Sequence, residues 1–304
     1  MPTDFITIDD VSNDELAALV EAAHASSRGG SLGSPLAGRS VALLFEKPSL
    51  RTKVSFDIAV HELGGHPLYL GASEVGLDTR EPVEDVAHVL EQWVAAIVAR
   101  VFAQSTLTRF AATAGVPVVN ALSDHEHPCQ AVADVLTATQ RLGPLAGRTV
   151  AYVGDANNCA RSLGLAAVAL GARFTIAAPE GYGFDAASLA QIDARMPGHR
   201  TLQTPDPAEA VRDASVVYTD VWTSMGQEAE SAVRLKAFAG FQVNPALLAH
   251  ARPEVILLHP MPAHYGEEVP AGMLDHPASA AYQQAGNRLH AQKAVIALLT
   301  GAGR

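Results

Sequence analysis

Residues 149–179 read TVAYVGDANNCARSLGLAAVALGARFTIAAP, and this stretch decides the fold class. TVAYVGD and RFTIAAP have the length and apolar character of buried strands, and residues 157–171 between them have the length of a helix. This order predicts a parallel strand–helix–strand unit. Dinucleotide-binding folds carry Gly-x-Gly-x-x-Gly after the first strand, but here Gly154 stands alone in that turn, so the indication of a dinucleotide is weak.

The same alternation continues on both sides of this stretch. Further strands are predicted at residues 40–46, 95–101, 116–122, 214–220 and 254–259, with helices between most of them. We therefore predict an α/β fold of two domains, residues 1–143 and 144–304, joined at GPLAGR (143–148). Each domain should be a mainly parallel sheet flanked by helices. In such sheets ligands bind beyond the carboxyl ends of the strands.

Composition narrows the class of protein. The chain has 304 residues, 48% of them hydrophobic, and a formal net charge of −11. That charge argues against binding to nucleic acid but leaves room for a small anion in a locally positive pocket. Cys129 and Cys159 form neither a disulfide framework nor a zinc motif. We see no signal peptide and no membrane-spanning run, so we expect a cytoplasmic location and no membrane partner.

The segment FEKPSLRTKVSF (45–56) places polar side chains where a strand turns into a helix. The free N–H groups of a helix start favour a phosphate, and Ser49, Arg51 and Thr52 add hydroxyl donors and a two-pronged cation. Each charge-assisted bond would contribute about 1.5–3 kcal/mol. The alternative is structural, with Ser49 as a helix cap and Arg51 as a solvated side chain.

A second candidate is NALSDHEHPCQAVADV (120–135). His127 and Gln130 lie at a helix start after a buried strand, where they can bind a carbonyl oxygen and an amide. A capping role for His127 is equally open. A metal at His125 and His127 is disfavoured because a third ligand at suitable spacing is missing.

The segment YTDVWTSMGQE (218–228) clusters Asp220, Ser224 and a glycine just after a strand. A carboxylate can pair with an ammonium, while a hydroxyl and N–H groups can hold a carboxylate, so the set suits an amino acid; a capped turn is the alternative. Asn157 and Asn158 could offer amides to the same ligand or simply cap their helix.

The segment EVILLHPMPAHYGEE (254–268) raises the question of a metal. His259 and His264 are five residues apart, but the prolines between them exclude the helix that a His-Glu-x-x-His zinc site needs. We predict no metal here. Arg288, at the head of the last helix, could serve a phosphate or only a carboxylate.

Six motifs in order, FEKPSLRTKVSF, HPCQ, GDANN, DVWTSMGQE, LLHPMPAHYGEE and NRLHAQKA, give the chain a resemblance to the aspartate/ornithine carbamoyltransferase family over essentially its whole length. The resemblance implies that the first domain binds carbamoyl phosphate and the second the amino acceptor. It implies a last helix, at about 283–300, that packs back on the first domain. It also implies a homotrimer, or a higher assembly of trimers, and no cofactor.

The resemblance also implies roles for individual residues. Arg51, Arg100 and His127 would be catalytic. The carbamoyl phosphate site would comprise Ser49, Leu50, Arg51, Thr52, Arg100, His127, Pro128, Cys129, Gln130 and Arg288. The ornithine site would comprise Asn158, Asp220, Ser224 and Met225, with Pro260 and Met261 in a loop near the reacting amine.

Three positions depart from the family pattern. Leu50 stands where threonine is common, although its backbone N–H remains. Near Glu74 a glutamine from a neighbouring subunit is expected, and an ionised Glu74 would repel phosphate unless it points away or Arg80 takes over. Pro260 stands where the ornithine enzymes carry cysteine, and Ala263 replaces the arginine of the aspartate enzymes.

The predicted reaction is carbamoyl transfer from carbamoyl phosphate to the side-chain amine of L-ornithine, giving citrulline and phosphate for arginine biosynthesis. Alternative acceptors are putrescine, an acylated ornithine and, less favoured, aspartate. A catalytically silent carbamoyl phosphate sensor is a different class, which the intact Arg51, His127 and Gln130 disfavour. A dinucleotide-dependent oxidoreductase is a third, which the missing glycine motif disfavours.

Overall fold

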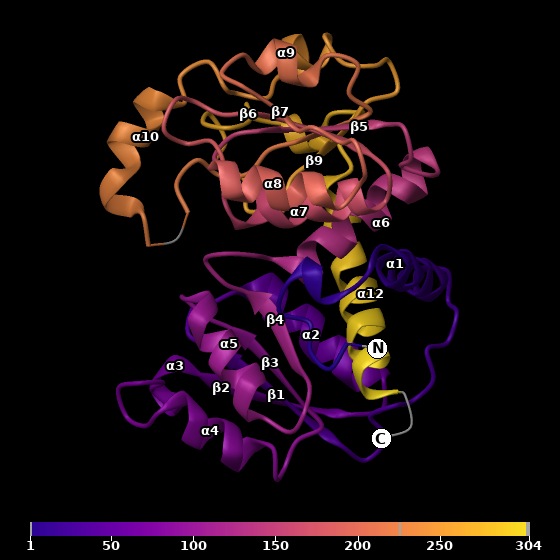
Figure 1. Cartoon of the computed structure of the whole chain (residues 1–304), viewed down its shortest axis with the longest axis vertical. Helices are drawn as coiled ribbons and strands as arrows, with labels where there is room; N and C mark the ends of the chain where they lie inside the picture. Colours follow the sequence, from indigo (N-terminus) through magenta and orange to yellow (C-terminus); the bar gives the residue numbers. More distant parts are fainter. Residues whose placement is uncertain (1, 225, 302–304) are drawn as a thin grey trace. The chain divides into compact units, whose positions relative to one another are not determined.

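The computed structural model describes residues 2–224 and 226–301. These residues form two compact units, one made of residues 2–136 with 286–301 and the other of residues 137–285 (Figure 1). The chain passes from one unit to the other within two helices, α6 (Pro128–Leu142) and α12 (Ala281–Thr300). Among the described helices, none has a stretch long and apolar enough to cross a lipid bilayer.

The first unit is built on a four-stranded sheet in the order β2-β1-β3-β4, with every neighbouring pair parallel. Its helices and strands before α6 are η1 (Ile8–Asp10), α1 (Asn13–Ser27), β1 (Ser40–Phe45), α2 (Leu50–Glu62), β2 (His66–Gly71), α3 (Ala72–Val75), α4 (Val83–Leu90), β3 (Ala96–Arg100), α5 (Gln104–Thr113) and β4 (Val118–Leu122). Because the strands are parallel, β1, β3 and β4 all end at the same edge of the sheet.

Alternation along the strands gives this sheet two apolar faces. Ala42 and Leu44 of β1 belong to one buried cluster with Val86 of α4 and Phe110 of α5. The residues between them point to the opposite face, and they too are buried. The C-terminal part of α12 is bonded to two helices of this unit, with Lys293 Nζ 2.6 Å from Glu62 Oε2 on α2 and His290 Nδ1 3.1 Å from Ser26 Oγ on α1.

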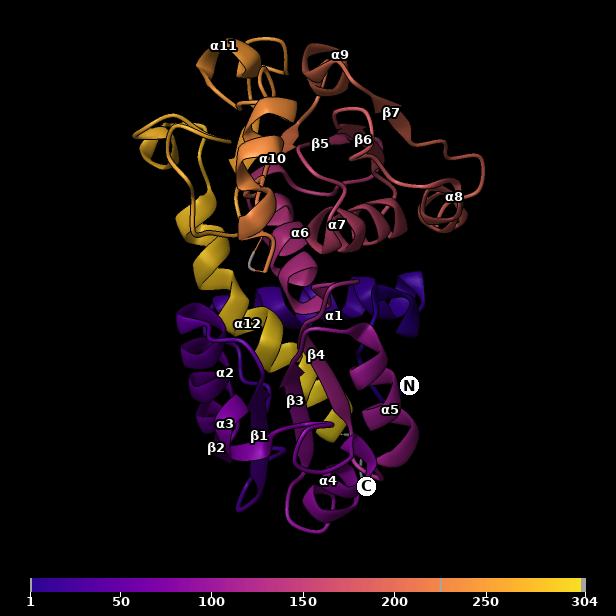
Figure 2. The ribbon, with the colours of Figure 1, turned by 90° about the vertical axis from the view of Figure 1, so that its left-hand side faces the viewer.

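The second unit has a five-stranded parallel sheet in the order β7-β6-β5-β8-β9. Helices α7 and α8 lie on one side of it and α9 on the other (Figures 1 and 2). The elements are β5 (Thr149–Val153), α7 (Asn158–Ala169), β6 (Arg173–Ala177), α8 (Ala186–Ala194), β7 (Leu202–Thr204), α9 (Pro207–Val211), β8 (Val216–Tyr218), η2 (Glu228–Glu230), α10 (Ser231–Ala237), α11 (Pro245–Leu248), β9 (Ile256–Leu258) and η3 (Met273–Asp275).

The parallel strand–helix–strand motif predicted at residues 149–179 is confirmed. β5 and β6 pair in parallel from Thr149 with Arg173 onward, and α7 connects them. Gly164 lets α7 approach the sheet closely, because a Cβ at this position would lie only 2.9 Å from the ring of Phe174. A side chain there would have to displace either the helix or the ring.

The α/β fold with two helix-flanked parallel sheets is confirmed, and residues 286–300 of the last helix belong to the first unit. Two strands were missed, β2 and β7. Both lie at sheet edges and are largely exposed, so they lack the continuous apolar run of a buried strand. Ser12 and Glu15 cap the start of α1, and the buried face of this helix extends to Ser26.

Candidate active site

The first cluster of predicted residues begins at the N-terminus of α2, directly after the carboxyl end of β1. Ser49 caps the helix: its Oγ accepts the Thr52 N–H at 3.3 Å and donates to Thr52 Oγ1 at 2.9 Å. The side chain of Leu50 is 76% exposed, so it contributes only its backbone to this helix start. Arg51 is half-buried, and burial lowers its pKa from the usual value.

Arg288 of α12 reaches the same helix start. Its Nη2 donates to Thr52 Oγ1 at 2.5 Å, and both side chains are almost fully buried. The two residues are 236 positions apart in the chain. The fold therefore joins the first and last of the six motifs at one place in the first unit.

His127 completes a basic cluster with Arg288 and Arg100. Arg100 is the last residue of β3, and His127 immediately precedes α6. Burial lowers the pKa of His127 well below its usual value, and the positive charges of Arg288 and Arg100 lower it further. His127 is therefore neutral near pH 7, which leaves it one N–H to donate and one nitrogen to accept.

This depressed pKa predicts how stability depends on pH. Below about pH 6.5 an unfolded chain protonates His127, while the folded chain does not, so the free energy of unfolding falls as the pH drops. The contribution is at most about 1.4 kcal/mol for each pH unit. We expect His127→Gln to reduce the loss of stability between about pH 7 and pH 5, as measured by denaturant unfolding at each pH.

His250→Gln is the matched control, because His250 is exposed. It should leave the pH dependence as it is in the unmodified chain. An unchanged pH dependence in His127→Gln would show that His127 titrates alike in the folded and unfolded chains.

The first turn of α6 supplies a second polar element. Gln130 is buried, and its Nε2 donates to Asp134 Oδ1 at 2.7 Å. Its Oε1 is also buried and has no hydrogen-bond partner among the described residues, so it is an acceptor that a ligand could use. Pro128 starts the helix, and burial raises the pKa of the Cys129 thiol to about 12, so Cys129 is a neutral packing residue.

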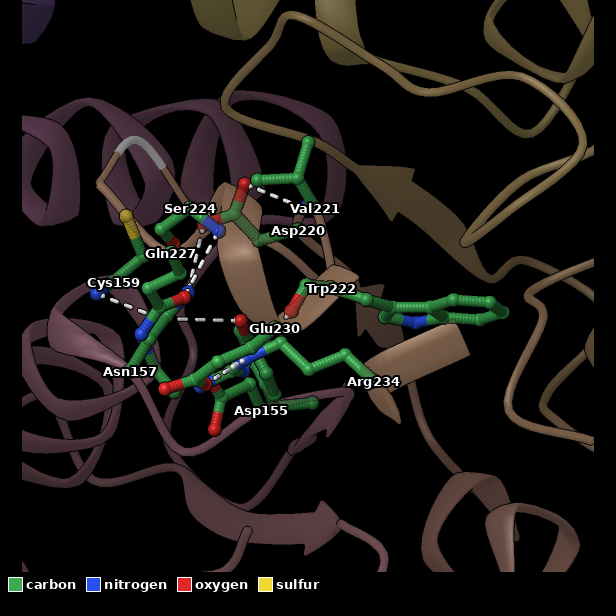
Figure 3. Close-up of polar contacts among 12 residues, drawn as sticks. Asp155, Asn157, Cys159, Asp220, Val221, Trp222, Ser224, Gln227, Glu230 and Arg234 are labelled. Atoms are coloured by element: carbon green, nitrogen blue, oxygen red, sulfur yellow. Dashed lines mark hydrogen bonds and ion pairs between the residues drawn. The ribbon is translucent and has the colours of Figure 1, made fainter. Parts of the chain in front are cut away.

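In the second unit Asp220 follows β8 and is buried. Its Oδ2 accepts from Asn157 Nδ2 at 2.9 Å, and its Oδ1 accepts from the Val221 N–H at 2.8 Å (Figure 3). Burial raises the pKa of Asp220 above its usual value. Because each carboxylate oxygen can accept more than one bond, Asp220 keeps acceptor capacity for a cationic group.

The orientation of Asn157 is set by its neighbours. Asn157 Oδ1 accepts the N–H groups of Cys159 and Ala160 and the hydroxyl of Tyr152, so its NH₂ group has to face Asp220. Asn158 Oδ1 accepts from the same Cys159 N–H at 3.0 Å. Asn157 thus contacts Asp220 directly, and the role of Asn158 in binding ornithine stays a prediction.

Ser224 lies in a turn closed by Gln227. The Ser224 N–H donates to Gln227 Oε1 at 3.0 Å, and the Gln227 N–H donates back to the Ser224 carbonyl at 3.0 Å (Figure 3). The turn therefore holds the hydroxyl of Ser224 four positions after Asp220. Met225, which was predicted to contact the acceptor, lies outside the described residues.

The loop after β9 is held by a buried histidine. His259 Nδ1 accepts the Met261 N–H at 2.9 Å, so its proton is on Nε2, which lies 3.0 Å from Glu268 Oε1. The His259 N–H itself donates to Gln284 Oε1 at 2.8 Å. Met261 adopts a φ of 54°. These bonds hold the Pro260–Met261 turn through His259 and the backbone N–H of Met261, and the side chain of Pro260 takes no part in them.

The same loop contains a group of possible metal ligands. His264, Glu267 and Glu268 each offer one ligand atom, and these atoms lie within 4.8 Å of one another. Glu268 Oε1 already accepts from His259 and from the His264 N–H, at 3.0 and 2.6 Å. This bonding accounts for the position of Glu268 without an ion, and we assign no metal to the group.

Glu74 and Arg80, the residues of the second departure from the family pattern, both bond to groups of their own segment. Glu74 Oε2 accepts the Gly71 N–H at 2.7 Å and so caps the short helix α3. Arg80 Nη1 donates to the Glu74 carbonyl at 3.1 Å. The carboxylate of Glu74 is therefore turned back onto its own helix.

The sequence analysis did not predict several residues that lie in or beside these two clusters. Lys47, in the first motif, is partly buried, and burial and Arg100 lower its pKa. Asp155 and Arg234 form a largely buried ion pair beside Asn157, and Glu268 supports His259. The position of Asp155, two residues after the buried strand β5, could have marked it as a candidate. Nothing in the sequence indicated that Arg234 would be buried.

The first unit carries a basic cluster and the second a carboxylate cluster, and the models of two carbamoyltransferase domains match the chain. Residues 3–140 match the model of the carbamoyl-P binding domain of aspartate/ornithine carbamoyltransferase, and residues 146–299 match the model of its Asp/Orn binding domain. The chain belongs to the aspartate/ornithine carbamoyltransferase family.

Individual relatives are similar over nearly the full length. The ornithine carbamoyltransferase of Acidothermus cellulolyticus is 49% identical over 98% of this chain and 96% of its own. The anabolic ornithine carbamoyltransferase of Pyrococcus furiosus is 45% identical over the same shares. The solved structure of ornithine carbamoyltransferase from Pyrococcus furiosus superposes with a TM-score of 0.94 at 44% identity, covering 99% of this chain and 98% of that one.

Proposed function

We infer that this chain transfers the carbamoyl group of carbamoyl phosphate to the side-chain amine of L-ornithine, giving L-citrulline and phosphate. This is a step of arginine biosynthesis, in keeping with the anabolic relative. The observation that carries the inference is the contact of Arg288 with Thr52 beside Arg51, His127 and Arg100. It forms a positive site in a chain whose formal net charge is −11, as binding of a small anion requires.

In the first unit we assign the phosphate to the start of α2 and to the arginines around it. The N–H groups of Ser49, Leu50, Arg51 and Thr52 provide a helix N-terminus, which favours an anion. Arg51 and Arg288 provide bidentate cations, which are suited to phosphate oxygens. Charge on the departing phosphate is balanced there as the bond to the carbamoyl carbon breaks.

The carbamoyl group itself needs donors and one acceptor. Arg100, neutral His127 and the hydroxyl of Thr52 donate to the carbonyl oxygen, on which charge develops as the tetrahedral centre forms. Gln130 Oε1, buried without a protein partner among the described residues, accepts from the carbamoyl NH₂ group. A protonated imidazole would add a third positive charge to the cluster, so the low pKa of His127 suits the neutral form.

In the second unit we assign the α-ammonium of ornithine to Asp220 and its α-carboxylate to Ser224, with Asn158 and Met225 at the same site. The loop containing Pro260 and Met261 lies near the reacting amine, where backbone carbonyls take the place of a thiol. The side-chain ammonium first gives up one proton to solvent, and the neutral amine attacks the carbonyl carbon. The tetrahedral centre then collapses as the C–O bond to phosphate breaks, and the leaving phosphate takes up the second proton from the attacking nitrogen.

One assay tests this function against its alternatives. The protein is incubated with carbamoyl phosphate and, separately, with ornithine, putrescine, lysine, acetylornithine or aspartate, and ureido products are quantified. We expect citrulline from ornithine and little product from the others. Absence of citrulline would refute ornithine as the acceptor, and absence of every product would favour a silent carbamoyl phosphate-binding protein.

We also propose a homotrimer. Leu50, Val54 and Ile58 recur every fourth residue along α2, and their side chains are 76%, 46% and 39% exposed. Leu68 and Tyr69 of the adjoining strand β2 are exposed as well. Exposed apolar side chains at helical spacing favour burial against another copy of the chain. Sedimentation equilibrium should give a mass of three chains, and a monomer mass at micromolar concentration would refute the proposal.

For the location of the enzyme we propose the cytoplasm. Both cysteines are buried as free thiols, which suits a reducing compartment. Immunoblotting of cell fractions with an antibody against the chain would test this, and recovery in a secreted fraction would contradict it.

A further inference from the structure

The stretch from Asp220 to Arg234 is tied at both ends to one short loop, the loop between β5 and α7. At its start Asp220 Oδ2 accepts from Asn157 Nδ2 at 2.9 Å. At its end Arg234 Nη1 donates to Asp155 Oδ2 at 2.7 Å (Figure 3). Asp155 and Asn157 are two residues apart, so both ties converge on nearly the same point of the second unit.

Arg234 is the centre of this arrangement. Its side chain is only 8% exposed, and it contacts groups from several elements. Besides Asp155, Nη1 donates to the Trp222 carbonyl at 3.0 Å, and Nε donates to Glu230 Oε2 at 3.0 Å. The guanidinium also lies 5.1 Å from the centre of the Tyr182 ring.

The contact with Trp222 matters because of its position in the chain. Trp222 stands between Asp220 and Ser224, the two residues assigned to the ammonium and the carboxylate of the acceptor. A bond from Arg234 to the Trp222 carbonyl therefore fixes the backbone midway between them. The forked geometry of arginine is needed for this, because one guanidinium has to bind Asp155, a carbonyl and Glu230 together.

Stability alone does not account for such a pair. Taking an aspartate and an arginine out of water costs free energy that their attraction often does not recover. The cost is visible at Asp155, where burial raises the pKa although Arg234 opposes the shift. A largely buried pair can instead fix the conformation of the chain around it. Here that chain is the segment that carries Asp220 and Ser224.

We propose that the Asp155–Arg234 ion pair is a positioning pair for the amino-acid acceptor, holding Asp220 and Ser224 at the spacing that binds both α-groups. The proposal rests on the proposed function, because it specifies how the acceptor site is held. The pair itself does not touch the substrate in this assignment. Its effect is transmitted through the Trp222 carbonyl and the loop that carries Asn157.

The test compares Michaelis constants for the two substrates in Arg234→Met, Arg234→Lys and Asp155→Asn. We expect Arg234→Met to raise KM for ornithine by about tenfold or more, equivalent to about 1.4 kcal/mol, with KM for carbamoyl phosphate unchanged within about twofold. Arg234→Lys keeps the charge without the fork and should fall between Arg234→Met and the unmodified chain. Asp155→Asn should resemble Arg234→Met, and the double variant should add little to either.

Arg252→Met is the matched control, because Arg252 is an exposed arginine of the same unit. Its Nη1 lies 3.9 Å from Oε1 of Glu254, which is also exposed, so this pair is solvated. It should change neither Michaelis constant. An unchanged KM for ornithine in the Arg234 and Asp155 variants, even with lower melting temperatures, would overturn the proposal and leave a structural ion pair. If Arg234→Met does not fold, Arg234→Lys and Asp155→Asn decide by the same criterion. A native chain that forms no citrulline would refute the proposed function instead, which keeps the two failures distinct.

Discussion

Replacement of Arg51 with alanine is expected to lower kcat/KM by about 10²- to 10⁴-fold while leaving the fold nearly as stable as before. Arg51 is half-buried at the first turn of α2, beside Thr52 and Arg288. Two charge-assisted bonds to phosphate, at about 1.5–3 kcal/mol each, amount to about 3–6 kcal/mol. That corresponds to a fall of about 10²- to 10⁴-fold in kcat/KM, measured by citrulline formation with carbamoyl phosphate varied.

The control for this variant is Lys53→Gln, which removes a positive charge from the same helix. Lys53 is exposed, and its Nζ lies 3.5 Å from the centre of the Tyr69 ring. We expect it to retain activity. A large drop in the melting temperature of Arg51→Ala would mean that Arg51 serves the fold, and retained activity would remove it from the phosphate site.

The second large effect is expected for Asp220→Asn. The substitution preserves size but removes the only charge that Asp220 can offer to the ammonium of the acceptor. Leaving one partner of a buried charge pair without the other costs about 2–5 kcal/mol. We expect kcat/KM for ornithine to fall by about 30- to 5,000-fold, with KM for carbamoyl phosphate nearly unchanged. Initial rates with each substrate varied in turn measure both quantities.

Asp213→Asn is the matched control for this change. Asp213 is exposed in the same unit and has a φ of 58°, a conformation that asparagine adopts readily. Equal losses for the two substrates in Asp220→Asn would point to a damaged fold rather than to a lost acceptor contact. Full activity would exclude Asp220 from the ornithine site.

The strands predicted from apolar runs were found where both faces of the sheet are covered. The strands Ser40–Phe45 and Thr149–Val153 are interior strands of their sheets, and after its first residue each is apolar throughout. β2 escaped prediction because, as an exposed edge strand, it needs no such run and even accommodates Pro67. What the sequence conveys about a strand is thus mainly how deeply it is buried.

For the candidate site, contacts within one motif could be predicted from the sequence, but contacts between distant segments could not. The sequence offered a helix cap as one of two interpretations of Ser49, and the structure has this cap, which depends only on local contacts. The contact between Thr52 and Arg288 depends on the tertiary fold, and only the resemblance to a family suggested that both residues serve one site. Arg234 was missed for a related reason. In the segment SAVRLKAF it resembles any solvated helical arginine, and its burial depends on Asp155, 79 positions earlier.

The position of Arg288 has a consequence for synthesis on the ribosome. Most of the first unit, including Thr52, is translated before residue 137, but the phosphate site proposed for it includes an arginine made 236 residues after Thr52. A nascent chain therefore passes through a long stage in which its first sheet can form while one cation of the site is still untranslated. Carbamoyl phosphate would stabilise only the nearly finished polypeptide, so ligand binding can assist the last step of folding but not the first.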